Sequence, residues 1–174
     1  MAKNAHFAQV RVLDDERIGR EARAAPGDHS AVRLWLRLLS CSTQIEQEIR
    51  ARLRRRFGTT LARFDYLAQL ERAPQGLRMN ALSRYLMVTG GNVTGLTDQL
   101  VDEGWVERVP DPVDRRSLSV RLTPAGRQQF LRMAEEHEAW LAEMFEGFEV
   151  EQREALYEML GRLRVHIASP KERG

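Results

Sequence analysis

The stretch that most constrains the fold is residues 78–122, because its hydrophobic pattern changes from a helical period to strict alternation. Two short segments carry apolar residues three and four apart: Met79, Leu82 and Leu86, then Val93, Leu96 and Leu100. Each segment therefore predicts a helix that buries one stripe of side chains. Two short helices joined by a tight turn have the spacing of a helix-turn-helix.

The second helix has small or polar residues opposite its apolar stripe, namely Gly91, Asn92, Thr94, Gly95 and Asp98. Glycine inside a helix costs about 0.5–1 kcal/mol relative to alanine, so these glycines need another reason. A helix that enters a DNA groove about 12 Å wide has one, because missing side chains let its backbone approach phosphates and base edges. Thr89 is placed to cap this helix, where free N–H groups favour a phosphate.

A two-stranded hairpin is predicted after Gly104, which is a good helix stop. Residues 105–109 form the first strand, and residues 118–122 form the second, with Leu118, Val120 and Leu122 on a buried face and Ser119 on a wet one. The polar segment between them, PDPVDRRS, is a protruding tip that carries Arg115 and Arg116. Arginine on such a tip can enter the minor groove of DNA.

With the TGGNVTGLTDQL helix and the DRRSLSVRLTPAG hairpin, the sequence resembles the MarR family of winged helix-turn-helix regulators over about residues 30–168. The resemblance implies a dimeric transcription factor, often a repressor released by a small molecule. It implies that Thr89, Asn92 and Thr94 face the groove beside Gly91, and that Arg115 and Arg116 contact DNA from the wing. Family recognition helices commonly carry arginine where this chain has Gly95 and Gln99. The remaining electrostatic load therefore falls on Arg78, Arg84 and Arg108.

The expected fold is mainly α with a small β-hairpin wing, a winged helix-turn-helix joined to a helical dimerisation region. Residues 58–122 form the DNA-binding domain, and residues 30–57 and 123–168 form the dimerisation region. The latter helices are too apolar on one side to stand alone, so we expect a homodimer that reads a pseudo-palindromic operator in double-stranded DNA. Residues 1–29 are an N-terminal arm, either a dispensable tail or a segment that crosses to the partner, and residues 169–174 are a C-terminal tail.

Cap residues predict where the helices begin. Ser30 caps a helix that runs to about Phe57, roughly 40 Å long, and Thr60 caps a helix over residues 61–73. Thr123 and Pro124 open the next helix, whose stripe includes Phe130, Met133 and His137, and a last helix starts near residues 149–151. Arginines crowd the end of the first helix, where they answer its dipole or contact phosphate: Arg52, Arg54, Arg55 and Arg56.

Four residues form a candidate effector site: Arg33, Trp35, Arg37 and Arg63. Arginine pairs with carboxylate, and tryptophan offers a flat apolar surface. The alternative is two surface arginines beside a core tryptophan, with Arg63 paired to Asp65 or another internal acid. The family resemblance suggests a small anionic aromatic effector, such as an aromatic carboxylate or its coenzyme A thioester.

Several classes of function are disfavoured. No apolar run approaches the roughly 20 residues that span a bilayer, so we expect a cytoplasmic protein without membrane contact. No nucleotide-binding loop, nucleophile elbow or metal-ligand spacing occurs, so we expect neither an enzyme nor a cofactor or metal. His137 is read as a buried, hydrogen-bonded histidine rather than a metal ligand.

Two other functions stay open. Cys41 is the one cysteine, so no disulfide forms within the chain, and its oxidation could displace DNA in a thiol-sensing regulator. A winged-helix domain can also bind another protein instead of DNA. Charge does not decide between these functions, because residues 58–126 hold as many arginines as acidic residues.

Overall fold

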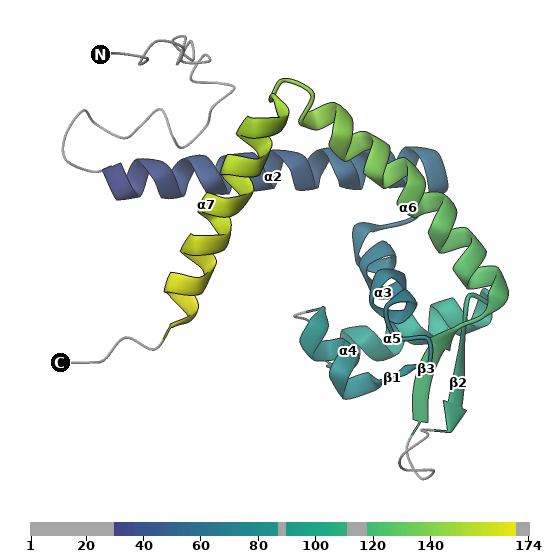
Figure 1. Ribbon diagram of the computed structural model, residues 1–174. Helices are drawn as coiled ribbons and strands as arrows, with labels where there is room; N and C mark the ends of the chain where they lie inside the picture. Colours follow the sequence, from purple (N-terminus) through teal and green to yellow (C-terminus); the bar gives the residue numbers. More distant parts are fainter. Residues whose placement is uncertain (1–29, 87–89, 111–117, 170–174) are drawn as a thin grey trace, which may run out of the picture. The chain divides into compact units, whose positions relative to one another are not determined.

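The computed structural model describes residues 30–86, 90–110 and 118–169 of the chain (Figure 1). The chain divides into two units, residues 1–58 and residues 59–174. The described part of the first unit is one long helix, α2 (Ser30–Phe57). The second unit contains, in chain order, α3 (Leu61–Glu71), β1 (Leu77–Arg78), α4 (Met79–Tyr85), α5 (Gly90–Asp102), β2 (Val106–Pro110), β3 (Leu118–Leu122), α6 (Pro124–Met144) and α7 (Val150–Ala168).

The helices begin where the cap residues predict. The Thr60 side chain accepts a hydrogen bond from the Arg63 amide at the start of α3, and Thr123 accepts one from the Gly126 amide at the start of α6. Glu149 and Gln152 form a reciprocal capping box at the start of α7. The predicted end of α3 at residue 73 was wrong by two residues, because the chain turns at Arg72.

The sheet has three strands in the order β1-β3-β2, one more than the predicted hairpin. In β1, Leu77 pairs with Val120 and Arg78 pairs with Ser119, both antiparallel. Gly76 makes this pairing possible: its φ is +97°, and a Cβ there would lie 3.0 Å from the Val120 carbonyl oxygen. The added strand therefore fixes the chain just before α4 to the strand that leads from the hairpin tip.

The predicted alternation in β3 was wrong at two positions. Ser119 is buried and Leu118 is exposed, although Val120 is buried and Arg121 is exposed as expected. The reason is that β3 is the central strand. Ser119 has a paired residue on both sides, Arg78 on β1 and Val109 on β2, so a position that alternation assigns to solvent is covered.

The core of the second unit lies where α3 packs against α6, β3 and α4, and where α4 packs against α5. Full burial of one large apolar side chain contributes about 1.5–3 kcal/mol, so the set shared by these elements carries most of the stability. In the second unit, the largest fully buried apolar side chains are Tyr66, Leu67, Leu70, Leu82, Val93, Leu100, Val106, Val120 and Met133. Across the described ranges, no helix has both the length and the hydropathy needed to cross a membrane.

Candidate nucleic-acid interface

The exposed face of α5 carries the residues that the sequence assigns to the groove. Gly91, Thr94, Gly95 and Asp98 are all exposed. A Cβ added at Gly91 or Gly95 would meet no atom of the described residues within 4 Å, so packing among them gives no reason for glycine at either position. Asn92 lies in α5, but its side chain and the whole of Thr89 fall outside the described residues.

The buried face of α5 is held by Val93, Thr97 and Leu100, each with no exposed surface. The sequence assigned the middle position to Leu96, which is only partly buried. Thr97 takes it because its hydroxyl is satisfied, lying 2.6 Å from the Tyr66 hydroxyl and 2.7 Å from the Val93 carbonyl oxygen. Burial raises the pKa of Tyr66, so its phenol stays protonated and able to donate.

An ion pair joins the exposed face of α5 to the hairpin. Arg108, on the exposed side of β2, donates from Nη2 to the Asp98 carboxylate. Charge-assisted bonds of this kind orient the guanidinium. Arg108 is therefore held beside the same face that carries Thr94 and Gly95.

The other arginines assigned to DNA lie on or near α4. Arg84 is exposed in the last turn of α4, and Arg78 immediately precedes its first turn. The wing arginines Arg115 and Arg116, together with Asp114, lie outside the described residues. The strands that lead to them are paired as far as Pro110 and Leu118.

The effector candidates of the first unit lie near the start of α2. Arg33, Trp35 and Arg37 are all exposed, and the Trp35 side chain keeps 60% of its surface. Arg33 and Arg37 are one helical turn apart and share a face, whereas Trp35 is two residues from each and does not face them.

Arg63, the fourth effector candidate, lies in the first turn of α3 in the second unit. Its guanidinium donates to the Glu103 carboxylate and lies 5.1 Å from the centroid of the Trp105 ring. The sequence required an acid near Arg63, and Asp65 was one candidate. Glu103 is 40 residues away in the chain, and no local pattern pointed to it. The Arg63 Nε is buried without a hydrogen-bond partner among the described residues.

Two further residues concern the alternative functions. The Cys41 thiol is exposed on α2. The His137 ring on α6 packs against Phe64 with ring centroids 4.8 Å apart, and burial lowers the pKa of His137 while the nearby Asp65 carboxylate opposes that shift. Across residues 30–86, 90–110 and 118–169, no group of three or more His, Cys, Asp or Glu side chains is arranged to hold a metal ion.

A family model and individual relatives among known proteins both indicate a transcriptional regulator. The model of the MarR family matches residues 57–117. Over 99 residues the chain is 36% identical to the transcriptional activatory protein BadR of Rhodopseudomonas palustris. This alignment covers 56% of each protein, so it spans less than two thirds of BadR.

Two solved structures are similar over more of the chain. A MarR family transcriptional regulator from Silicibacter pomeroyi is 33% identical with a TM-score of 0.65, and the match covers 82% of this chain and 99% of that one. Sco3205, a MarR family transcriptional regulator from Streptomyces coelicolor solved in complex with DNA, is 26% identical with a TM-score of 0.68, covering 85% of this chain and 94% of its own. These relatives are regulators, not enzymes. The chain belongs to the MarR family of transcriptional regulators.

Proposed function

We propose that this protein is a homodimeric, sequence-specific DNA-binding regulator that represses its target genes until a small molecule releases it. The observation that carries the proposal is the exposed face of α5. Gly91 and Gly95 weaken the helix, yet no contact among the described residues requires them. A partner outside the chain that needs close backbone approach explains both glycines, and the major groove is such a partner. The DNA complex of Sco3205 supports this choice.

We assign different roles on DNA to the residues of α5, to the arginines beside it and to those of the hairpin tip. In this proposal Thr94 and Asn92 read base edges, while Arg78, Arg84 and Arg108 contact phosphates. Arg115 and Arg116 enter the minor groove from the wing. Phosphate contacts supply affinity that falls with salt, and base contacts supply sequence preference.

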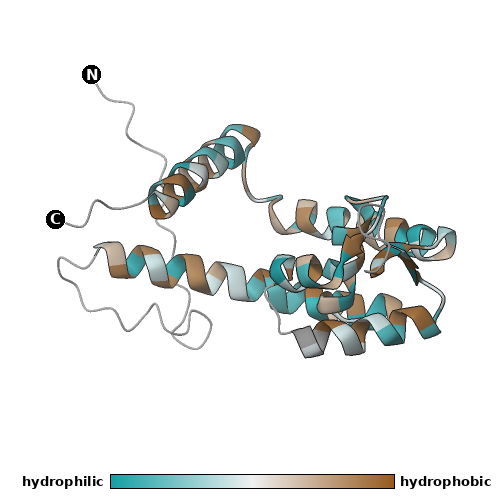
Figure 2. Ribbon diagram, turned by 90° about the horizontal axis from the view of Figure 1, so that it is seen from below, coloured by the Kyte–Doolittle hydropathy of each residue, from teal (hydrophilic) through white to brown (hydrophobic). Residues whose placement is uncertain are grey.

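Exposed apolar surface supports the homodimer. In α7 no residue is buried, and Tyr157, Val165 and Ile167 keep 78%, 68% and 72% of their surface. Figure 2 shows hydrophobic residues interspersed with hydrophilic ones along this helix, the one next to the C-terminal label. Where exposed apolar residues form a contiguous patch, they mark an interaction surface. A second copy related by a two-fold axis would cover them. The dimer would then present two DNA-binding domains to half-sites about 34 Å apart.

We propose that a small anionic aromatic effector, either a carboxylate or its coenzyme A thioester, releases the protein from DNA. Arg33 and Arg37 share one face of α2 and offer guanidinium groups suited to a carboxylate. An effector can act only through a difference in its affinity for two states. In this proposal the DNA-bound and the released state of the dimer differ in the spacing of its two DNA-binding domains.

Fluorescence anisotropy with labelled DNA tests the proposal. The probes are the region upstream of the protein's own gene and a scrambled duplex of equal length and composition. We expect preference for the upstream region, and about tenfold or greater loss of affinity in Arg116→Ala, with the salt slope reduced by about one. Arg50→Ala, which removes an exposed arginine paired with Glu46 on α2, is the matched control. Equal binding to both duplexes, or an unchanged Arg116→Ala variant, would contradict the proposal.

Two further measurements address assembly and regulatory direction. Light scattering should give twice the 20.0 kDa mass of the chain, and Ile167→Asp should lower it. Deletion of the gene should raise expression of its targets. Because BadR is named an activatory protein, a fall in expression is the outcome that would replace repression with activation.

The exposure of Cys41 favours a second candidate function, control by oxidation of a thiol. Peroxide should then release DNA from the wild-type protein and leave Cys41→Ser bound. An identical response of the two proteins to peroxide would eliminate this function.

A further inference from the structure

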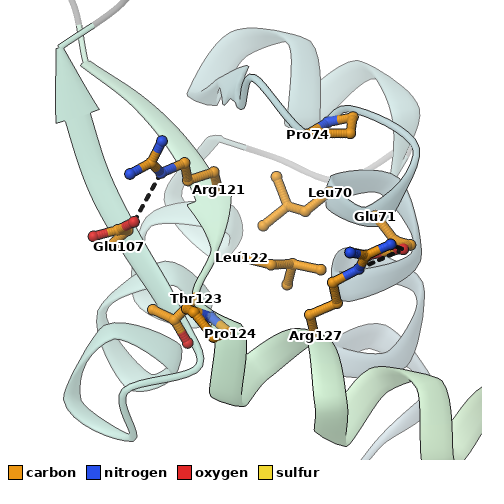
Figure 3. A pocket seen from close by; sticks show the side chains of 9 residues that line it. All are labelled: Leu70, Glu71, Pro74, Glu107, Arg121, Leu122, Thr123, Pro124 and Arg127. Atoms are coloured by element: carbon orange, nitrogen blue, oxygen red, sulfur yellow. Dashed lines mark hydrogen bonds and ion pairs between the residues drawn. The ribbon is translucent and has the colours of Figure 1, made fainter.

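A pocket of about 400 Å³ lies at the base of the hairpin, and none of its lining residues is among those assigned above to DNA or effector. It forms where α3 ends, β2 and β3 run side by side, and α6 begins (Figure 3). This volume lies within the roughly 300–1,000 Å³ of small-molecule sites in proteins.

The centre of the pocket is apolar. Leu70 from α3 and Leu122 from β3 point toward each other, with Pro74 and Pro124 on either side of them (Figure 3). Leu70 keeps only 1% of its surface and forms the buried floor, whereas Leu122 is partly exposed and offers the accessible apolar surface. Such a surface suits an apolar side chain.

Two ion pairs flank the leucines on opposite sides (Figure 3). Arg127 donates from Nε to both Glu71 carboxylate oxygens, at 3.0 and 3.2 Å, and Arg121 donates from Nε to Glu107 at 2.7 Å. The four charges cancel. A ligand with one charge that took Arg127 would leave Glu71 without its partner, whereas a ligand with both charges replaces both halves of the broken pair.

The Glu71–Arg127 pair is the better suited of the two to exchange partners. Glu71 is the most sheltered of the four charged side chains, with 23% of its surface exposed against 43% or more for the others. Attraction to a sheltered carboxylate is less screened by water. Arg127 is 63% exposed, and exposed ion pairs of this kind contribute little to stability, so the pair opens readily.

We propose that this pocket binds a free α-amino acid with a large apolar side chain. Its carboxylate pairs with Arg127, its ammonium group pairs with Glu71, and its side chain lies on Leu70 and Leu122. This binding site is independent of the proposed DNA function, because the pocket residues contribute nothing to the exposed face of α5.

Isothermal titration calorimetry of the full chain with L-phenylalanine tests the proposal without DNA. N-acetyl-L-phenylalanine lacks the ammonium charge, L-phenylalanine methyl ester lacks the carboxylate, and glycine lacks the apolar side chain. We expect saturable binding of L-phenylalanine and about tenfold or weaker binding of each analogue, since each leaves a polar partner or the leucines unmatched.

Two variants connect the binding to the pocket. Arg127→Gln should weaken L-phenylalanine about tenfold or more and keep the wild-type melting temperature, because the side chain is exposed. Arg50→Gln, which breaks another exposed arginine–glutamate pair on α2, should bind as the wild type does. Absence of binding to phenylalanine, leucine and tryptophan would overturn the proposal. Equal binding of the N-acetyl compound would overturn the zwitterionic class, and an unchanged Arg127→Gln variant would overturn the location.

Discussion

The hydroxyl of Tyr66 on α3 lies 2.6 Å from the hydroxyl of Thr97 on α5, and both side chains are fully buried. The Thr97 hydroxyl also lies 2.7 Å from the carbonyl oxygen of Val93, one turn earlier in α5. A carbonyl only accepts, so Thr97 donates its proton to Val93 and Tyr66 donates to Thr97. Tyr66 therefore depends on Thr97 as its acceptor, whereas Thr97 does not depend on Tyr66 to bond its own proton.

The first prediction follows from that inequality. Thr97→Val should cost about 1–3 kcal/mol, because the Tyr66 donor is left buried without an acceptor. Tyr66→Phe should lower the free energy of unfolding by about 1 kcal/mol, because the Thr97 hydroxyl still donates to the Val93 carbonyl oxygen. Urea unfolding of both variants and of the double variant measures the difference, and the double variant should lose less than the sum. A greater loss in Tyr66→Phe would reverse the assigned direction.

The second prediction separates stability from DNA binding. Gly95→Ala should stabilise the fold by about 0.5–1 kcal/mol, because it improves the helix and a Cβ there meets nothing within 4 Å. The same variant should bind DNA more weakly, because the added methyl group holds the helix backbone away from the groove. Thermal unfolding and anisotropy on one protein sample measure both effects. A variant that gains stability and keeps full affinity would remove the groove as the reason for this glycine.

Alanine at Gly126 should destabilise the fold, in contrast to alanine at Gly95. A Cβ at Gly126 would lie 1.8 Å from the carbonyl oxygen of Trp105, so alanine forces the first turn of α6 away from the segment between α5 and β2. Gly126→Ala should lose about 1–3 kcal/mol, the usual cost of overpacking. Gly95→Ala is its matched control in the same denaturation experiment, and stability losses of equal size in both variants would contradict this account.

Asp98→Asn tests the acidic member of the α5 ion pair. The substitution removes a negative charge beside the proposed DNA-facing surface and releases Arg108 for a phosphate. We expect tighter binding to scrambled DNA, with a salt slope steeper by about one phosphate contact. The ratio of specific to scrambled affinity should fall. Weaker binding to both duplexes would mean instead that the carboxylate orients Arg108 productively.

The pKa of His137 gives a prediction for stability against pH. Burial lowers it below the ordinary 6.5 in the folded chain, while Asp65 works against that shift. Below about pH 6.5 the unfolded chain therefore binds a proton here more readily than the folded chain, and stability falls as pH falls. His137→Gln should narrow the difference between melting temperatures measured at about pH 7.5 and pH 5.5. An unchanged difference would assign the acid sensitivity to other groups.

Local rules predicted where α3, α6 and α7 begin and which residues of α5 are exposed. Thr60 and Thr123 cap where predicted because capping depends on neighbours within three residues. The exposed positions Thr94, Gly95 and Asp98 followed from helical period alone. The family assignment from the recognition-helix and wing motifs was confirmed as well.

Features that depend on distant contacts were missed. β1 has two residues and no periodicity, and it is a strand only because Val120 and Ser119 are there to pair with it. Thr97 is buried because Tyr66, 31 residues earlier, supplies a hydrogen bond. The pocket between Leu70 and Leu122 joins segments far apart in the chain. The assignments of Arg115, Arg116 and the effector residues stay predictions.

The hydrogen bonds of Thr123 connect the start of α6 to the segment that follows α5. Its amide donates to the Trp105 carbonyl oxygen at 3.0 Å, and its hydroxyl reaches the Gly104 carbonyl oxygen at 2.7 Å, two residues beyond the end of α5. A Cβ at Gly126 would meet the same Trp105 carbonyl, so a rotation of the first turn of α6 would displace residues 104 and 105, which follow α5. A movement of α6 would therefore be passed to the C-terminal end of α5 through hydrogen bonds to only two residues.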